Sequence, residues 1–349
     1  MKRRTFLNSA VLAPALAPKG FLWADANGGY EPDTGLLAAP RLAAPAPPSF
    51  IFSDNAARKT LTILDGSRGV LAFCYGDQLK PGVDPKQVRS GYIHPLFGLD
   101  GEVLTDDSPA DHLHHHGLFW TWPIIRTRGV KTGTWEPATP PLRQRFVRWT
   151  ERDVKDGAAA LGVESVWKLD EKEVVARERA RFVVHPAFER GRFIDITLII
   201  EAVGGPLEFQ GSQDAGKGYG GLCFRGAPQF KGAALTTDKG PQKEDAVNAA
   251  FRWADLSTAK GGIAVFVSPD RPGYPIPWLI RNSYAGILNP SWPGLNSAVV
   301  EAGKTITLRY RIYIHRGDVA AARVAGQYEA YSSKIDSNRQ GLLCCGGCR

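Results

Sequence analysis

The chain has 349 residues, a formal net charge of +8, 43% hydrophobic residues and 22% charged residues. These values are typical of a globular protein. The basic excess is scattered, and no block of Lys and Arg interleaves with aromatic residues, so we expect no nucleic acid partner. No stretch beyond the N-terminal segment reaches the ~18 consecutive apolar residues of a membrane span. We therefore expect no transmembrane segment in the mature chain.

The N-terminus has the pattern of an export signal. Arg3 and Arg4 precede Thr-Phe-Leu, as in signals that the Tat pathway reads. A short apolar stretch follows, and Ala24-Asp25-Ala26 offers an A-x-A cleavage site. We therefore predict a Tat signal peptide over residues 1–26 and a periplasmic or secreted location.

Composition divides the rest of the chain into three segments. Residues 27–48 are rich in Pro and Ala and predict a linker, whereas residues 49–334 have β-type patterning throughout. Residues 335–349 predict a flexible tail. The tail contains Cys344, Cys345 and Cys348. Three thiols lack a fourth ligand for a closed zinc site, so the tail is either unstructured or linked by a disulfide.

Short runs rich in Val, Ile, Phe and Thr, separated by Gly, Pro, Asp and Asn, predict strands within residues 49–334. The predicted strands cover residues 49–52, 59–64, 69–75, 118–125, 142–149, 158–169, 172–184, 192–203, 262–267 and 305–314. One helix is predicted, capped by Asp318 and ending near Ser332. Its apolar stripe would contain Ala321, Val324, Ala325, Tyr328 and Tyr331. The fold class predicted is all-β, a large antiparallel β-sandwich, jelly-roll-like, with one C-terminal helix.

Four of the seven histidines lie within five residues, between Asp111 and Gly117. An extended backbone would alternate their side chains between two faces. One face would present His112, His114, His116, Trp120 and Trp122. The other face would present Asp111 and His115. Imidazoles exchange protons near neutral pH and also bind metals, so this run predicts a catalytic or binding wall.

Two chemistries fit the histidine run. In the first, His112, His114 and His115 transfer protons and Asp111 orients an imidazole. In the second, His112, His114 and His116 hold a divalent metal with an open coordination position. No H-E-x-x-H motif and no facial-triad spacing identifies the metal, so the cofactor stays unknown.

Residues elsewhere in the chain are candidates for substrate binding. Arg89 and His94 precede the histidine run on an adjacent predicted strand, although His94 fits a hydrogen-bonded core histidine equally well. A Gly-rich loop contributes Asp214, Lys217, Tyr219 and Arg225. Lys217 and Arg225 would bind an anion, and the alternative is a surface hairpin with a solvated charge pair. Trp120, Trp122 and Trp278 would stack on a sugar ring.

These residues together resemble the bacterial PmoA-like family. The resemblance is carried by residues 93–96, 111–118, 217–222, Arg225, 277–278 and 308–311. The family's label refers to a methane oxygenase, and its members resemble exported proteins of bacteria that degrade complex carbohydrates. The resemblance also implies a galactose-mutarotase-like sandwich.

Three functions compete. The first is an exported enzyme that acts on a carbohydrate or sugar-derived substrate, as a lyase, epimerase or hydrolase, with a small molecule or oligosaccharide as its ligand. The second is a non-catalytic carbohydrate-binding protein, which would keep its tryptophans and need no histidines. The third is a metal-dependent oxygenase, as the family label implies.

Replacement of Arg3 and Arg4 by lysine tests the export signal. We expect the variant to stay in the cytoplasm, because the Tat pathway reads the arginine pair. The measurement is the periplasmic fraction of the processed protein. Unchanged processing in the double-lysine variant would contradict the prediction.

Overall fold

The structure is a computed structural model that describes residues 49–345, and side chains for residues 49–335. The predicted signal peptide, the predicted linker and the side chains of the three tail cysteines lie outside this range. Twenty-two strands and one α-helix form the described part. The prediction of an all-β antiparallel fold with one C-terminal helix is confirmed.

The strands form three sheets, in which every strand pair is antiparallel. The first sheet has the order β1 (Phe50–Asn55), β2 (Thr60–Asp65), β3 (Arg68–Cys74), β4 (Tyr92–Leu96), β5 (Leu118–Thr121), β13 (Gly221–Arg225), β20 (Ile287–Pro290), β19 (Ile276–Arg281) and β16 (Ala246–Phe251). The second sheet has the order β15 (Gly240–Gln242), β14 (Ala234–Thr237), β17 (Trp253–Ser257), β18 (Gly262–Val267), β22 (Thr305–His315), β11 (Gly191–Ala202), β10 (Glu173–Val184), β9 (Ala158–Leu169) and β8 (Leu142–Lys155). The third consists of β21 (Ser297–Val300), β12 (Leu207–Gln210), β6 (Ile124–Thr127) and β7 (Val130–Thr132).

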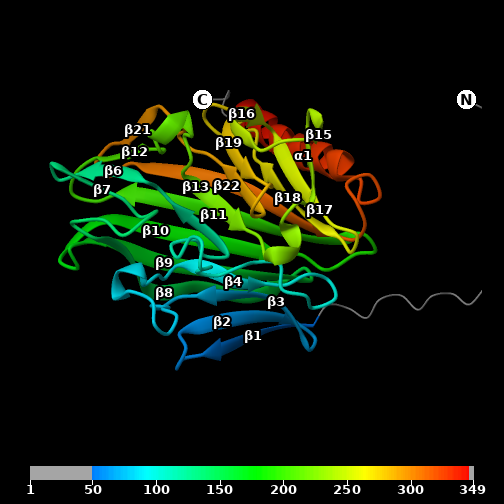
Figure 1. The fold of residues 1–349 in the computed structure, drawn as a ribbon, viewed down its shortest axis with the longest axis horizontal. Coiled ribbons are helices and arrows are strands. Elements are labelled where there is room, and N and C mark those ends of the chain that lie inside the picture. The colour runs from blue at the N-terminus through cyan, green and yellow to red at the C-terminus, as the bar shows by residue number, and fades with distance from the viewer. Residues whose placement is uncertain (1–48, 346–349) are drawn as a thin grey trace, which may run out of the picture. The chain divides into compact units, whose positions relative to one another are not determined.

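The first and second sheets pack face to face, and their inner faces form the main hydrophobic core (Figure 1). Phe73 of β3 contacts Phe182 of β10 with ring centroids 5.5 Å apart, and Trp120 of β5 contacts the same ring at 6.0 Å. Alternation decides which side chains reach this core. In β10, for example, Ala180 and Phe182 are buried and Arg181 between them is exposed.

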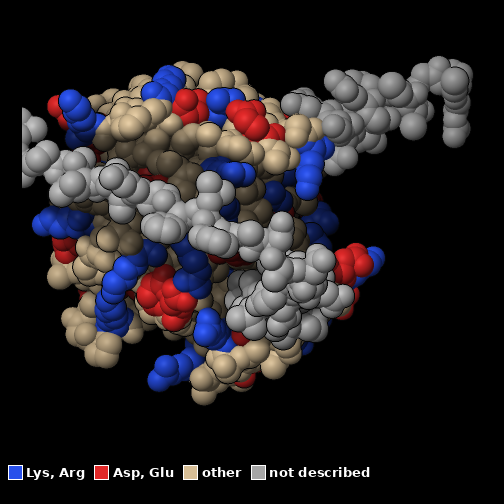
Figure 2. All heavy atoms as spheres, turned by 90° about the vertical axis from the view of Figure 1, so that its right-hand side faces the viewer, with Lys and Arg blue, Asp and Glu red and all other residues tan. Residues whose placement is uncertain are grey.

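The outward-facing positions of the strands carry many charged side chains. Arg181 of β10 donates to Glu151 of β8 at 2.6 Å, and Arg148 donates to Glu164 at 2.9 Å. On the face drawn in Figure 2, Lys and Arg side chains (blue) lie beside Asp and Glu side chains (red). This face is thus of mixed charge, and exposed ion pairs contribute little to stability.

The prediction of one continuous strand over residues 118–125 is wrong, because the strand is interrupted in the middle. It is two strands, β5 in the first sheet and β6 in the third, separated at Trp122 and Pro123. Proline has no N–H to donate to a sheet ladder, so the chain leaves the first sheet there. The backbone N–H of Trp122 instead bonds Thr134 Oγ1 at 3.1 Å.

The C-terminal helix α1 (Val324–Cys345) covers the outer face of the second sheet over β17 and β18. It starts later and ends later than predicted. Asp318 caps a separate turn, accepting from the N–H groups of Ala320 and Ala321, and Arg323 with φ +53° interrupts the chain before α1. No proline follows to end the helix, which therefore continues through the first part of the predicted tail.

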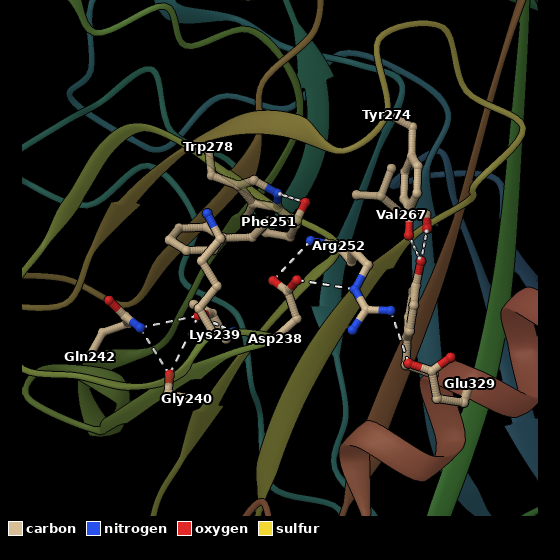
Figure 3. Close-up of polar contacts among 12 residues, drawn as sticks. Asp238, Lys239, Gly240, Gln242, Phe251, Arg252, Val267, Tyr274, Trp278 and Glu329 are labelled. Carbon is tan, nitrogen blue, oxygen red and sulfur yellow. Dashed lines mark hydrogen bonds and ion pairs between the residues drawn. The ribbon is translucent and has the colours of Figure 1, made fainter.

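The packed face of α1 differs from the predicted stripe. Val324, Tyr328 and Tyr331 are buried as predicted, but Ala321 and Ala325 are exposed and Ala322 is buried instead. The interruption at Arg323 changes which face of the preceding turn meets the sheet. Arg252, next to β17, links the sheet to α1 (Figure 3). Its Nε donates to Asp238 Oδ2 at 3.1 Å, and its Nη1 donates to Glu329 Oε1 of α1 at 3.0 Å. Within residues 49–345, no helix is long and apolar enough to cross a bilayer.

Trp120 is a stability determinant of the core, because it is 1% exposed and its indole N–H bonds Glu178 at 3.0 Å. We expect Trp120→Ala to lower the free energy of unfolding by about 3–5 kcal/mol through loss of apolar contact and a cavity. Urea denaturation measures this change. Trp149→Ala, the same substitution at a half-buried site on β8, is the control and should lower the free energy of unfolding by less. A loss below about 1 kcal/mol in Trp120→Ala would contradict the assignment.

Candidate functional site

The candidate site lies on the outer face of the first sheet. There β4, β5 and β13 present Tyr92, Phe119 and Cys223, which form a second apolar cluster with Trp135. The segment of residues 105–117, between β4 and β5, folds back over this face. It is held by bridges between Asp107 and His116 and between Thr105 and Gly226. The histidine run is therefore placed over β5 and β13.

The histidine run forms a turn, so the prediction of an extended strand is wrong. His112 N–H bonds the carbonyl of Pro109 and His115 N–H bonds the carbonyl of His112, both at 3.0 Å. Gly117 then carries the chain into β5 with φ +43°, and a Cβ there would lie 2.2 Å from the carbonyl oxygen of Ile93. Only glycine fits this crossing.

The turn gathers three imidazoles that a strand would have divided between two faces. The rings of His112 and His115 stack with centroids 4.6 Å apart and an interplanar angle of 11°. His114 meets both rings nearly edge-on, at 5.7 Å from His112 and 4.6 Å from His115. The three histidines predicted to be catalytic thus form one cluster, which we call the histidine triad.

Asp111 and Arg225 hold this triad on the sheet. Arg225, the last residue of β13, donates from Nη2 to both Asp111 oxygens at 2.9 and 3.0 Å. Its Nη1 lies 3.3 Å from His115 Nδ1, and Asp111 Oδ2 lies 3.0 Å from His112 Nδ1. The structure thus brings Asp111 to an imidazole, as predicted. However, Arg225 is engaged by Asp111, so its predicted role in binding a substrate anion is replaced by a positioning role.

Burial and neighbouring charges keep two of these histidines neutral. Desolvation, together with His112 and other nearby cationic groups, lowers the pKa of His114 to about 4. Desolvation and the neighbouring His114, His112 and Arg225 lower the pKa of His115 to about 2. Desolvation opposes ionisation of Asp111, but hydrogen bonds from His112 and Arg225 outweigh it and lower the pKa of Asp111 to about 2. At neutral pH the triad can therefore accept a proton beside a fixed negative charge.

A pocket of about 350 Å³ opens next to the triad. Its walls include Arg89, His114, Trp135, Glu136 and Gln144. The His114 Nε2 atom lies 3.6 Å from Glu136 Oε1. His114 is therefore the member of the triad that faces a space of ligand size.

His116 does not join the other histidines, so the predicted metal set of His112, His114 and His116 is wrong. The His116 Nδ1 atom lies 2.7 Å from Asp107 Oδ1, and its ring packs on Tyr92 at 4.9 Å. Among residues 49–335, no group of three or more His, Cys, Asp or Glu side chains has a metal-binding arrangement. His116 nevertheless lines the same pocket as His114.

His94 fits the core interpretation that the sequence left open. Its Nδ1 atom lies 3.0 Å from Thr105 Oγ1, which also accepts from the backbone N–H of Leu96. Desolvation lowers the pKa of His94. The residue therefore positions the segment that carries the histidine run.

The tryptophans predicted to stack on a sugar are core residues, so that prediction is wrong. Trp120, Trp122 and Trp278 are at most 1% exposed. The indole N–H of Trp122 bonds the Trp292 carbonyl at 2.7 Å, and that of Trp278 bonds the Phe251 carbonyl at 2.9 Å (Figure 3). The pocket has Trp135 instead. Nothing in the sequence around Trp135 distinguishes it from a core residue.

The Gly-rich loop contributes only part of its predicted residues. Asp214 and Lys217 form an ion pair three residues apart, with the Asp214 side chain 69% exposed. This is the solvated charge pair of the alternative interpretation. Tyr219 packs on Trp135 with centroids 4.6 Å apart, and Trp135 contacts His115 at 5.8 Å. Tyr219 therefore supports the pocket wall from behind.

Sequence reasoning missed Glu178. It is 2% exposed, and its Oε2 atom accepts from Trp120, Trp167 and Gln144 at 2.8–3.0 Å. Burial raises the pKa of Glu178, although these donors oppose the shift. The sequence did contain a signal for it. In β10, Glu178 lies two residues from both Ala176 and Ala180, so strand alternation places its side chain on the same inward face as theirs. A carboxylate at an inward position requires dedicated donors.

The lowered histidine pKa values predict a pH-dependent stability. The unfolded state binds a proton to His115 near pH 6.5 and the folded state near 2, so the free energy of unfolding falls as pH falls below about 6.5. His115 should contribute about 2 kcal/mol of this loss between pH 7 and 5. Urea denaturation of His115→Gln should show a pH dependence reduced by that amount. An unchanged dependence would contradict a neutral, buried His115.

Three solved structures align with this chain at low sequence identity. A heparan sulfate lyase HepC mutant from Pedobacter heparinus aligns with 7% identity and a TM-score of 0.38 over 77% of this chain and 35% of that one. A galactose mutarotase related enzyme from Lactobacillus acidophilus aligns with 8% identity and a TM-score of 0.37, over 76% of this chain and 97% of the enzyme. An alpha-galactosidase from Lactobacillus brevis aligns with 8% identity and a TM-score of 0.38, over 77% of this chain and 40% of the galactosidase. This chain thus spans about a third of the length of the lyase.

No curated protein matches the sequence. The resemblance to the PmoA-like family stays a prediction. One family model matches residues 60–329, most of the described domain, and its description is "Family of unknown function (DUF6807)". The chain therefore belongs to the DUF6807 family.

Proposed function

We propose that the protein is an exported enzyme that acts on a carbohydrate or sugar-derived substrate in the pocket beside the histidine triad, with His114 as the proton acceptor. The observation that carries the proposal is the position of His114. Its ring is neutral at pH 7, lines the pocket and contacts both other members of the triad. A general base needs a free lone pair and access to the substrate, and His114 has both.

The pocket wall suits a polyhydroxylated ligand. A site for sugars needs hydrogen-bond donors and acceptors together with an apolar surface. Glu136 offers acceptors, Arg143 and Lys86 offer donors, and Gln144 carries an amide that provides both. Trp135 lines the pocket with the 4% of its surface that is exposed, and the volume suits a monosaccharide unit of a longer chain.

The acidic groups of the pocket favour proton abstraction over glycoside hydrolysis. Hydrolysis of a glycosidic bond usually requires two facing carboxyl groups. The carboxylates among the pocket-lining residues are Asp77 and Glu136, and Asp77 is paired with Arg145. Glu136 faces His114, where it would orient the imidazole and stabilise its charged form. Removal of a proton from carbon, the first step of a lyase or an epimerase, needs one base, and a neighbouring carboxylate stabilises the imidazolium that forms.

A purely carbohydrate-binding role has less support. Such modules commonly present flat aromatic rings to solvent. No tryptophan within residues 49–335 is exposed. His114 and His116 instead line the pocket, where a binding platform would not need them.

Substitution of His114 tests the proposal. We expect His114→Ala to lower kcat on the order of a hundredfold, the usual effect of losing a general base, and to shift Tm by only a few degrees. The measurement is product release from a panel of glycosides and uronate-containing oligosaccharides, with thermal melts alongside.

His185→Ala is the matched control. His185 pairs with Asp195 at 2.8 Å on the second sheet, outside the pocket, so its removal should leave turnover unchanged. Full activity in His114→Ala would remove this residue from the mechanism. A large fall in Tm would instead assign His114 to the structural framework.

A further inference from the structure

Arg89 is the least neutralised cation of the pocket. Among the other basic residues of the wall, Arg143 and Arg145 lie near Glu171, and Lys86 is exposed to water. Arg89 forms no ion pair with any residue in the described part of the chain. It donates from Nη1 to the carbonyl of Thr134, and its Nε and Nη2 atoms are buried without a hydrogen-bond partner there.

The nearest compensation for this charge is incomplete. Glu178 attracts Arg89 electrostatically, but the Glu178 Oε2 atom is already occupied by two indoles and an amide. Burial lowers the pKa of Arg89 to about 10, so the guanidinium is still charged at neutral pH. A buried cation without a hydrogen-bonded anion is costly, and an anion beside it would offset that cost.

The free edge of Arg89 suits a carboxylate. The Nε and Nη2 groups form one side of the guanidinium fork, which matches the two oxygens of a carboxylate. This edge is free of hydrogen bonds to the described chain, whereas Nη1 is held by the Thr134 carbonyl, so a carboxylate at the edge would complete the hydrogen bonding of the guanidinium. The other arginine near the triad, Arg225, has no such freedom, since Asp111 occupies it.

We propose that the substrate is a carboxylated sugar of the uronate class, whose carboxylate binds the free edge of Arg89 while its ring lies against Trp135 and His114. This inference rests on the proposed function and adds the substrate class. A carboxylate, unlike a sulfate, also acidifies the hydrogen on the adjacent carbon, which is the proton that a base such as His114 would remove in a lyase or epimerase.

The electrostatics of His114 agree with this assignment. Arg89 is one of the cations that hold the pKa of His114 low, at about 4, after desolvation and the neighbouring histidines. Neutralisation of Arg89 by a carboxylate would raise the pKa of His114 toward the working pH, where a general base is most effective. The charged substrate would thus improve the base that acts on it.

Calorimetric titration with matched acidic and neutral sugars tests the proposal. The probes are D-glucuronate and D-galacturonate, compared with D-glucose and D-galactose, which differ only at the carboxylate carbon. We expect the acids to bind at least about tenfold more tightly, as one charge-assisted pair allows. Arg89→Met should remove the difference. Arg126→Met, which deletes one positive charge paired with Glu208 outside the pocket, should keep it.

The outcomes separate this inference from the proposed function. Equal affinity for acids and neutral sugars would overturn the uronate assignment and leave the sugar enzyme standing. Absence of binding by every sugar of both kinds would overturn both. Glucose 6-sulfate bound as tightly as glucuronate would overturn the choice of a carboxylate.

A second measurement does not depend on the folding of Arg89→Met. Imidazole NMR titration of the wild-type protein should show the pKa of His114 rising when glucuronate is added and unchanged when glucose is added. An unchanged titration in the presence of bound glucuronate would place its carboxylate away from Arg89 and His114, and would overturn the proposal.

Discussion

Arg225 determines where the candidate site forms. Its backbone N–H bonds the carbonyl of Gly117 at 2.7 Å, and its carbonyl accepts from Asp106 at 3.0 Å. Its guanidinium contacts Asp111 and His115 from the same position. One residue at the end of β13 thus fixes both ends of the histidine turn and its apex. Together with the hydrogen bonds of Thr105 to His94 and Leu96, this clamp holds residues 105–117 on the sheet.

The clamp also explains why the imidazoles are unusual. The turn stacks His112 on His115 and places His115 against Phe119, on an apolar part of the sheet. A histidine in that position loses water and gains a cationic neighbour, and both effects favour its neutral form. The low pKa values therefore follow from the placement of the turn on the sheet. A histidine run in a solvated loop would titrate near its ordinary value.

The strands were predictable because alternation is a local property. The predicted limits of residues 158–169 and 262–267 agree with β9 and β18. The first run alternates along its second half and ends before Asp170, whereas the second is a short apolar run that is buried throughout. The histidine run carries the same period-two signal, but Pro109 and Gly117 set a turn that outweighs it. The sequence alone therefore located the histidine cluster. It could not show on which side each ring lies, because that depends on contacts with β13, which is over a hundred residues away in the chain.

The roles of the two arginines depend on long-range pairing in the same way. From the sequence, Arg225 and Arg89 are both candidates for substrate binding, and Arg225 is the one expected to bind an anion. The fold pairs Arg225 with Asp111 and puts Arg89 beside a carboxylate that two core tryptophans already hold.

Glu178 therefore links the core to the pocket. It is fixed by Trp120 and Trp167 on one side and by Gln144 of the pocket wall on the other. Its donors come from three strands in two sheets, so its carboxylate cannot shift toward Arg89 without breaking hydrogen bonds. The Glu178 carboxylate thus partly compensates the buried charge of Arg89 without bonding to it. The Nε and Nη2 edge of Arg89 is left for a ligand. The same core that stabilises the sandwich thus prepares the charge of the pocket.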